Sequence, residues 1–110
     1  MIRAFTRQEI TDIFRKARRI LRHPGLDILI VPKNFDIARL LVITPKKIGN
    51  APERNRVRRR IKAIWHEAQL DQQPYDCIVI VKQPGVELSF EVLKQLVLDT
   101  FYTIQNRPTQ

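Results

Sequence analysis

Residues 46 to 62 read KKIGNAPERNRVRRRIK, and this basic stretch constrains the fold more than any other part of the chain. It holds eight Lys and Arg residues against the single acid Glu53, a balance of +7 in a chain whose formal net charge is +9. If Glu53 to Ala68 is helical at about 100° per residue, one apolar stripe of that helix must face a core. The stripe consists of Val57, Ile61, Ile64, Trp65 and Ala68.

The same helical phase decides where the cations of this segment lie. On the side opposite the stripe it places Asn55, Arg56, Arg59, Lys62 and His66, and at the edges of the stripe Arg54, Arg58 and Arg60. Like charges three and four residues apart destabilise a helix, so the cluster needs a compensating anion. Arginine suits a phosphate backbone because its planar fork binds phosphate oxygens in two bonds and stacks on exposed bases. The pattern therefore predicts a nucleic-acid contact rather than a merely solvated charged face.

Length and composition limit the remaining possibilities. A chain of 110 residues with 44% hydrophobic and 28% charged residues has the size and balance of one globular domain, residues 1–110. Its apolar runs are far shorter than the roughly 20 residues of a membrane-spanning helix, and its first eleven residues do not resemble a secretory signal. We therefore expect a cytoplasmic protein. Cys77 is alone, which excludes an internal disulfide and predicts a core residue.

Helical and extended patterns alternate along the chain. Thr6 and Glu9 form a capping box at the start of a first helix, which the apolar spacing extends to Pro24-Gly25. Two β-rich runs follow at 27–31 and 38–44, and the turn residues between them predict an antiparallel pair.

The Arg-rich helix is predicted from about Ala51 to Gln69, followed by a strand at 75–82. Ser89 is the predicted N-cap of a last helix with an apolar stripe from Phe90 to Ile104. The order is α-β-β-α-β-α with a central sheet that has room for one further strand. This order predicts an α+β fold of the α/β-sandwich type.

No constellation in the sequence resembles the catalytic site of a protein nuclease. The two histidines, His23 and His66, stand beside basic sequence without an evident acid partner. The acidic residues are scattered without the spacing of a two-metal site. We therefore expect no catalytic residue in the protein and no metal ion held by the protein alone.

The basic stretch resembles the signature of the bacterial ribonuclease P protein family. In that family a Lys-Lys-x-Gly-x-Ala segment leads into an Arg-Asn-Arg motif and further basic residues. Here the two parts stand as Lys46-Lys47-Ile48-Gly49-Asn50-Ala51 and Arg54-Asn55-Arg56-Val57-Arg58-Arg59-Arg60. The order of elements is similar over nearly the whole chain. The resemblance implies an α/β sandwich in which the Arg-rich helix lies in a left-handed βαβ crossover, against the usual right-handed rule.

The resemblance also implies a function as the protein subunit of an endoribonuclease that matures the 5′ end of tRNA. Its partners would be the catalytic RNA and precursor tRNA, with no membrane and no protein partner required, and Mg²⁺ would be bound mainly by the RNA. The resemblance implies that nine residues contact the RNA subunit, and the basic face of the helix adds Lys62. The expected contacts are Lys46, Lys47, Asn50, Arg54, Asn55, Arg56, Arg58, Arg59, Arg60 and Lys62. Phe14 and Arg18 are the expected contacts to the 5′ leader, in a cleft between the first helix and the sheet.

Three other functions fit parts of the pattern. A structural RNA-binding protein of the ribosomal type would share the basic helix and the cytoplasmic setting. A DNA-binding regulator could place the Arg-rich helix in a major groove, but that helix lies between strands rather than in a helix-turn-helix. A membrane-surface role is disfavoured because the helix has little apolar surface left after its stripe is packed.

Overall fold

A computed structural model describes residues 5–105 of the chain. Its elements alternate between helices and strands, with short 3-10 helices η1 (Lys46–Ile48), η2 (Leu70–Gln72) and η3 (Gln83–Glu87) in the connections. In chain order the main elements are α1 (Arg7–Lys16), β1 (Arg18–Arg22), β2 (Leu26–Pro32), β3 (Leu40–Ile43), α2 (Ala51–Glu67), β4 (Tyr75–Val81) and α3 (Phe90–Gln105).

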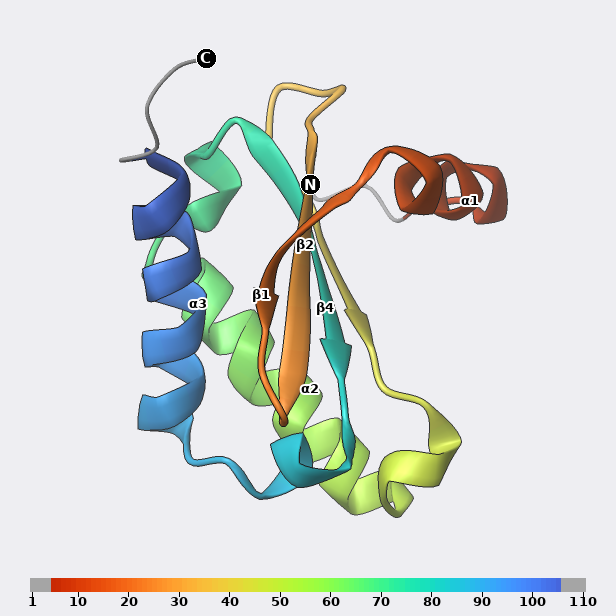
Figure 1. Ribbon diagram of the computed structural model, residues 1–110, viewed down its shortest axis with the longest axis vertical. Coiled ribbons are helices and arrows are strands. Elements are labelled where there is room, and N and C mark those ends of the chain that lie inside the picture. Colours follow the sequence, from red (N-terminus) through yellow and green to blue (C-terminus); the bar gives the residue numbers. More distant parts are fainter. Residues whose placement is uncertain (1–4, 106–110) are drawn as a thin grey trace.

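The four strands form one mixed sheet in the order β1-β2-β4-β3 (Figure 1). β2 is antiparallel to both β1 and β4, whereas β3 is parallel to β4. Because β3 and β4 are adjacent and parallel, α2 is the crossover helix of a βαβ unit. The α+β sandwich predicted from the sequence is thus confirmed, and the left-handedness of its crossover stays a prediction.

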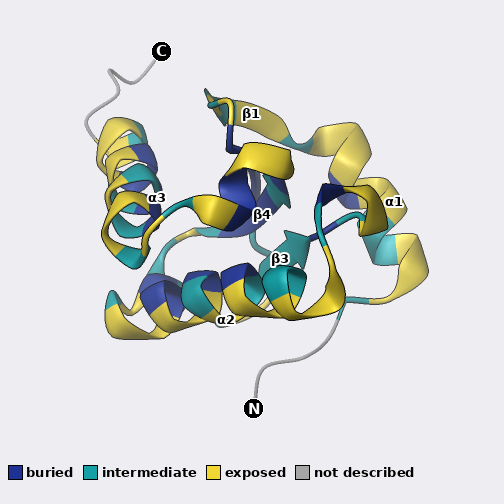
Figure 2. Cartoon of the chain, turned by 90° about the horizontal axis from the view of Figure 1, so that it is seen from below, coloured by how far each residue is buried: buried dark blue, intermediate teal, exposed yellow. Residues whose placement is uncertain are grey.

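Helices cover the two faces of the sheet unequally (Figure 2). On one face, β-strand residues such as Leu26, Ile28 and Val79 pack with α2 and α3 into the larger core. On the other face, Leu29, Val31 and Ile78 form a smaller cluster with Ile13 of α1. α1 is only ten residues long, so part of this second face lies outside its cover.

The helix starts agree with the capping signals in the sequence. Thr6 Oγ1 accepts the amide of Glu9 at 3.1 Å, and the Glu9 carboxylate accepts the amide of Thr6 at 3.0 Å, which confirms the predicted capping box. Ser89 Oγ accepts the amide of Val92 at 3.2 Å at the start of α3. Both caps satisfy amides that have no partner inside the helix.

The prediction that the first helix continues to Pro24-Gly25 is wrong. α1 ends at Lys16, Ala17 has extended backbone angles, and residues 18–22 form β1. The cause is tertiary: a turn held by the reciprocal amide bonds of His23 and Leu26 folds this segment back along β2. Leu21 fits helical spacing and strand alternation equally well, so the local pattern could not distinguish the two.

The predicted antiparallel pairing of the runs at 27–31 and 38–44 is also wrong. β4 lies between them, with Cys77 paired to Ile30 on one side and to Leu40 on the other. Cys77, Ile78 and Val79 are almost wholly buried, and a strand buried on both faces is most stable in the centre of a sheet. The lone cysteine is therefore a core residue, as predicted, and burial followed by the nearby Asp76 charge raises the pKa of its thiol.

A close backbone contact joins the β1–β2 turn to η3. A Cβ atom added at Gly85 would lie 2.1 Å from the carbonyl oxygen of Gly25. That same oxygen accepts the amide of Lys82 at 2.9 Å. Only glycine leaves room for this approach, which holds η3 against the β1–β2 turn.

Candidate nucleic-acid interface

The helical phase predicted for the Arg-rich segment is the phase that α2 adopts. Val57, Ile61, Ile64 and Trp65 are buried against the sheet and α3. The opposite side of the helix is open to solvent along its length (Figure 2). The predicted contact residues on that exposed side are Asn55, Arg56, Arg59 and Lys62.

The three arginines at the edges of the stripe are half-buried and bonded to neighbouring segments. Arg54 Nε donates to the carbonyl of Gly49 at 3.2 Å, and Arg60 Nη1 donates to the carbonyl of Leu88 at 2.9 Å. Arg58 donates to Thr44 Oγ1 and, at 3.3 Å, to Asn55 Oδ1. These arginines therefore hold α2 to the connections on either side of it.

Arg56 lies on the exposed side of α2 and, like the arginines at the edges of the stripe, is hydrogen-bonded to a neighbouring segment. The residue is exposed, yet its Nη2 donates to the carbonyl of Val86 at 3.0 Å. A guanidinium has five N–H donors, so one such bond leaves most of them available to a ligand. A side chain already held in one position loses less entropy when it binds. Arg54, Arg56, Arg58 and Arg60 thus form a partly ordered basic surface, whereas the side chains of Arg59 and Lys62 make no hydrogen bond or ion pair within residues 5–105.

The segment before α2 supplies its cap and two more cations. Asn50 Oδ1 accepts the amide of Glu53 at 2.9 Å while the Glu53 carboxylate accepts the amide of Asn50 at 2.9 Å. The cap occupies the side chain of the only acid in the basic stretch. Lys46 and Lys47 are exposed on η1, immediately before this cap. The capping role of Asn50 was not predicted, although an Asn three residues before a Glu is a capping signal.

The two residues predicted to contact a leader do not share one face of the sheet. Phe14 projects from α1 with 41% of its surface exposed. Arg18 pairs with Ile30, whose partner Cys77 belongs to the α2 and α3 side. Arg19 pairs with Leu29, which lies in the cluster under α1. The register therefore places Arg19, and not Arg18, on the same face as α1, and Arg22, which pairs with Asp27, lies on that face as well.

Charged residues continue along that face away from α1. The Asp27 carboxylate forms ion pairs with Arg19 at 3.4 Å and with Lys82 at 2.7 Å. On the same face lie the half-buried side chains of Leu41, Ile43 and Ile80, and Ile80 pairs directly with Asp27. A half-covered apolar strip bordered by cations has the chemistry that an unpaired nucleotide strand requires.

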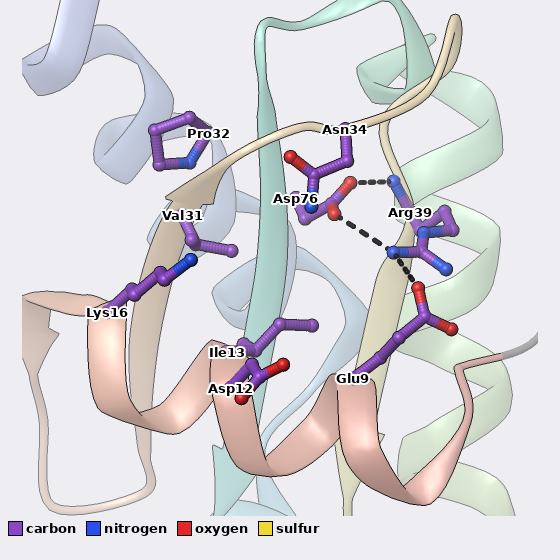
Figure 3. A pocket seen from close by; sticks show the side chains of 9 residues that line it. All are labelled: Glu9, Asp12, Ile13, Lys16, Val31, Pro32, Asn34, Arg39 and Asp76. Carbon is purple, nitrogen blue, oxygen red and sulfur yellow. Dashed lines mark hydrogen bonds and ion pairs between the residues drawn. The ribbon is translucent and has the colours of Figure 1, made fainter.

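A pocket between α1 and the end of the sheet contains the charged side chains of Arg39, Glu9 and Asp76, and no sequence motif predicted it (Figure 3). Arg39 is only 2% exposed and forms ion pairs with Glu9 at 3.0 Å and Asp76 at 3.5 Å. The bond from the Thr6 amide, followed by the bond from Arg39, lowers the pKa of Glu9. The pairing residue for Arg39 stands 37 positions away in the chain, which no local pattern indicates.

The histidines occupy ordinary structural positions. His23 Nδ1 accepts the amide of Gly25 at 2.9 Å in the β1–β2 turn, and His66 is exposed near the end of α2. Within residues 5–105, no three His, Cys, Asp or Glu side chains are grouped so that they could hold a metal ion. In the same range, no helix combines the length and apolar character needed to cross a membrane.

Comparison with known proteins places these features in one family. The sequence profile of the family Ribonuclease P matches residues 3–105. The ribonuclease P protein component of Bacillus pumilus is 33% identical over 86% of this chain and 80% of its own length. That of Photobacterium profundum is 34% identical over 87% of this chain and 81% of its own.

Solved structures agree with the fold. The RNase P protein of Staphylococcus aureus matches with a TM-score of 0.79 at 19% identity, over 93% of this chain and 94% of that one. The protein from Thermotoga maritima matches with a TM-score of 0.76 at 20% identity, over 90% and 94%. With a profile match over almost the whole sequence and relatives above 30% identity, the chain belongs to the ribonuclease P family, as a protein component of that ribonuclease.

Proposed function

We propose that this protein binds the catalytic RNA of ribonuclease P through α2 and η1 and holds the 5′ leader of precursor tRNA beside α1. The observation that carries the proposal is the exposed side of α2, where arginines and a lysine stand without acidic partners while the apolar side is fully packed. Each cation that meets a phosphate releases a condensed counterion, which favours association. The protein would act in the cytoplasm.

The contacts to the RNA subunit would fall on one continuous surface. Arg59 and Lys62 on α2, with Lys46 and Lys47 on η1, are free to bind phosphates. The partly ordered basic surface of Arg54, Arg56, Arg58 and Arg60 would add N–H donors that are already held in position. The contact set proposed for the RNA subunit is Lys46, Lys47, Asn50, Arg54, Asn55, Arg56, Arg58, Arg59, Arg60 and Lys62.

The leader would lie on the sheet face that α1 only partly covers. Phe14 could stack on an unpaired base, a contact worth roughly 1 to 3 kcal/mol. Arg19 shares this face and keeps 38% of its side chain exposed, so it is a better candidate than Arg18 for a phosphate of the leader. The apolar strip of Leu41, Ile43 and Ile80 would exclude water beneath the strand.

Catalysis would belong to the RNA subunit, with the protein supplying affinity and position. Mg²⁺ held by the RNA would activate the water that cleaves the precursor at the mature 5′ end. In this proposal the ion belongs to the RNA subunit, and the protein contributes no ligand of its own. Its cations would instead screen the repulsion between the phosphates of enzyme RNA and substrate.

Affinity as a function of leader length tests the proposal. The assembled complex of RNA subunit and protein is titrated with precursor tRNAs whose leaders increase from one nucleotide, and with mature tRNA as the control. We expect affinity to rise with leader length until the site is filled, and the RNA subunit alone to show a smaller rise. Equal affinity for precursor and mature tRNA would instead support a structural RNA-binding protein.

A further inference from the structure

α1 is attached to the sheet at two places. Toward its C-terminal end, Ile13 is buried and Ala17 packs beside it against Leu29, Val31 and Ile78. Ile13 is the only buried residue of this helix. The other attachment lies at the first turn and is made by the buried charge of Arg39.

Arg39 immediately precedes β3 and contacts three separate parts of the molecule. Its backbone amide donates to Asp76 Oδ1 at 2.7 Å, and its Nη2 atom lies 3.5 Å from Asp76 Oδ2. The same Nη2 lies 3.0 Å from Glu9 Oε2. The guanidinium carbon also lies 4.0 Å from the ring centre of Phe5 and 4.6 Å from that of Phe35. Figure 3 shows the guanidinium between the carboxylates of α1 and β4.

Glu9 joins this arrangement to the helix itself. One carboxylate oxygen accepts the amide of Thr6 at 3.0 Å and completes the cap, while the other receives Arg39 at 3.0 Å. The cap fixes the side chain relative to the helix, and the ion pair fixes it relative to the sheet. The rotation of the first turn of α1 is thereby set by the position of Asp76 near the start of the inner strand β4.

Stability alone is a poor explanation for such an arrangement. Burying a guanidinium and a carboxylate costs several kcal/mol in lost hydration, and apolar residues of similar volume often stabilise a fold as well or better. Buried charge pairs do specify geometry, because they tolerate few alternative arrangements. What this pair specifies is the placement of α1, the helix that carries Phe14.

We propose that Arg39, acting through Glu9, is a positioning residue for the leader site: it holds α1 at the spacing and rotation that let Phe14 meet an unpaired base above the sheet. This inference rests on the proposed function of that face. Neither Arg39 nor Glu9 touches the leader in this account. Without the ion pair, α1 keeps its Ile13 contact and its cap but turns and shifts at its first turn, so that stacking on Phe14 is lost most of the time.

The decisive variant is Glu9→Gln in the full chain. Glutamine preserves the acceptor that a capping box needs, whereas the charge that pairs with Arg39 is removed. The matched control is Asp12→Asn, which removes one negative charge from the same helix at a residue that makes no ion pair within residues 5–105. Both variants change the electrostatic attraction of leader phosphates in the same direction.

The readout is the ratio of affinities for precursor and mature tRNA, measured on the complex assembled with the RNA subunit. We expect Glu9→Gln to lower this ratio about tenfold, the order expected for one lost stacking contact. Asp12→Asn should leave the ratio unchanged or raise it slightly. Affinity of both variants for the RNA subunit should equal that of the natural protein, and amide hydrogen exchange in α1 should accelerate only in Glu9→Gln.

Three results would overturn the inference while leaving the proposed function intact. An undiminished ratio in Glu9→Gln would show that the ion pair does not position the leader site. Equal losses in Glu9→Gln and Asp12→Asn would assign the effect to net charge. Unchanged hydrogen exchange in α1 would show that the helix is held without Arg39. If the natural protein itself gives no preference for precursor over mature tRNA, the proposed function fails, and this inference fails with it.

Discussion

The Asp76 carboxylate accepts the backbone amide of Arg39 at 2.7 Å and lies 3.5 Å from its guanidinium, so one residue of β4 binds both ends of the residue that precedes β3. Both side chains are 2% exposed. Asparagine at position 76 would keep an acceptor for the amide but leave the buried guanidinium with Glu9 as its remaining anion.

We therefore expect Asp76→Asn to lower the free energy of unfolding by about 3 to 5 kcal/mol, as when one partner of a buried ion pair is removed. Urea titration followed by circular dichroism measures the change. The exposed Asp12→Asn is the control and should stay within about 0.5 kcal/mol of the natural protein. A loss under 1 kcal/mol in Asp76→Asn would mean that water replaces the carboxylate.

Arg59 and Lys62 are the Arg and Lys residues of α2 whose side chains make no hydrogen bond or ion pair within the described residues. Replacing both by alanine should leave the unfolding free energy nearly unchanged and weaken binding to the RNA subunit. The slope of log affinity against log salt should become shallower by about 2, one for each lost phosphate contact. Filter binding from low to high salt measures both quantities. An equal effect from Arg15→Ala with Lys16→Ala on α1 would mean that net charge, and not the α2 surface, determines binding.

Arg60 differs from Arg59 although the two are neighbours. Arg60 donates to the carbonyl of Leu88 at 2.9 Å and thereby ties α2 to the segment before α3. We expect Arg60→Ala to cost about 1 to 2 kcal/mol of unfolding free energy, the order for a hydrogen bond with a charged donor. Arg59→Ala should cost less than about 0.5 kcal/mol. Equal unfolding midpoints in urea would contradict this division between structural and ligand-binding arginines.

The contact between Gly85 and Gly25 predicts a glycine requirement at one position and tolerance at another. Alanine at position 85 would place its Cβ 2.1 Å from a backbone oxygen, so η3 must move, at a cost of about 1 to 3 kcal/mol. Alanine at position 49 would meet the end of the Glu53 side chain at 3.0 Å, which can adjust more easily. Thermal unfolding of the two variants compares them, and a smaller loss for Gly85→Ala than for Gly49→Ala would refute the steric argument.

The sequence was sufficient wherever the pattern was local and strong. The phase of α2 follows from Val57, Ile61, Ile64 and Trp65, because an apolar stripe at helical spacing has one stable orientation against a sheet. The capping box at Thr6 and Glu9 and the cap at Ser89 depend on neighbours within one turn. The exposure of the α2 cations then followed from geometry alone.

Features that depend on distant partners could not be predicted in this way. Residues 18–22 form a strand because β2 offers them an edge, and not because of their own composition. β4 lies between β2 and β3 because it pairs with a strand on each of its edges. The order of the strands along the chain does not reveal this arrangement. The burial of Arg39 depends on Asp76, and the face occupied by Arg19 depends on a register that begins at the turn around Gly25.

The most direct test of the central claim is 5′ processing of precursor tRNA at low Mg²⁺ concentration by a bacterial ribonuclease P RNA, with and without this protein. The account predicts strong stimulation when the protein is present and no cleavage by the protein alone. Absence of stimulation with an RNA that is active at high Mg²⁺ concentration, or cleavage by the protein without RNA, would contradict it.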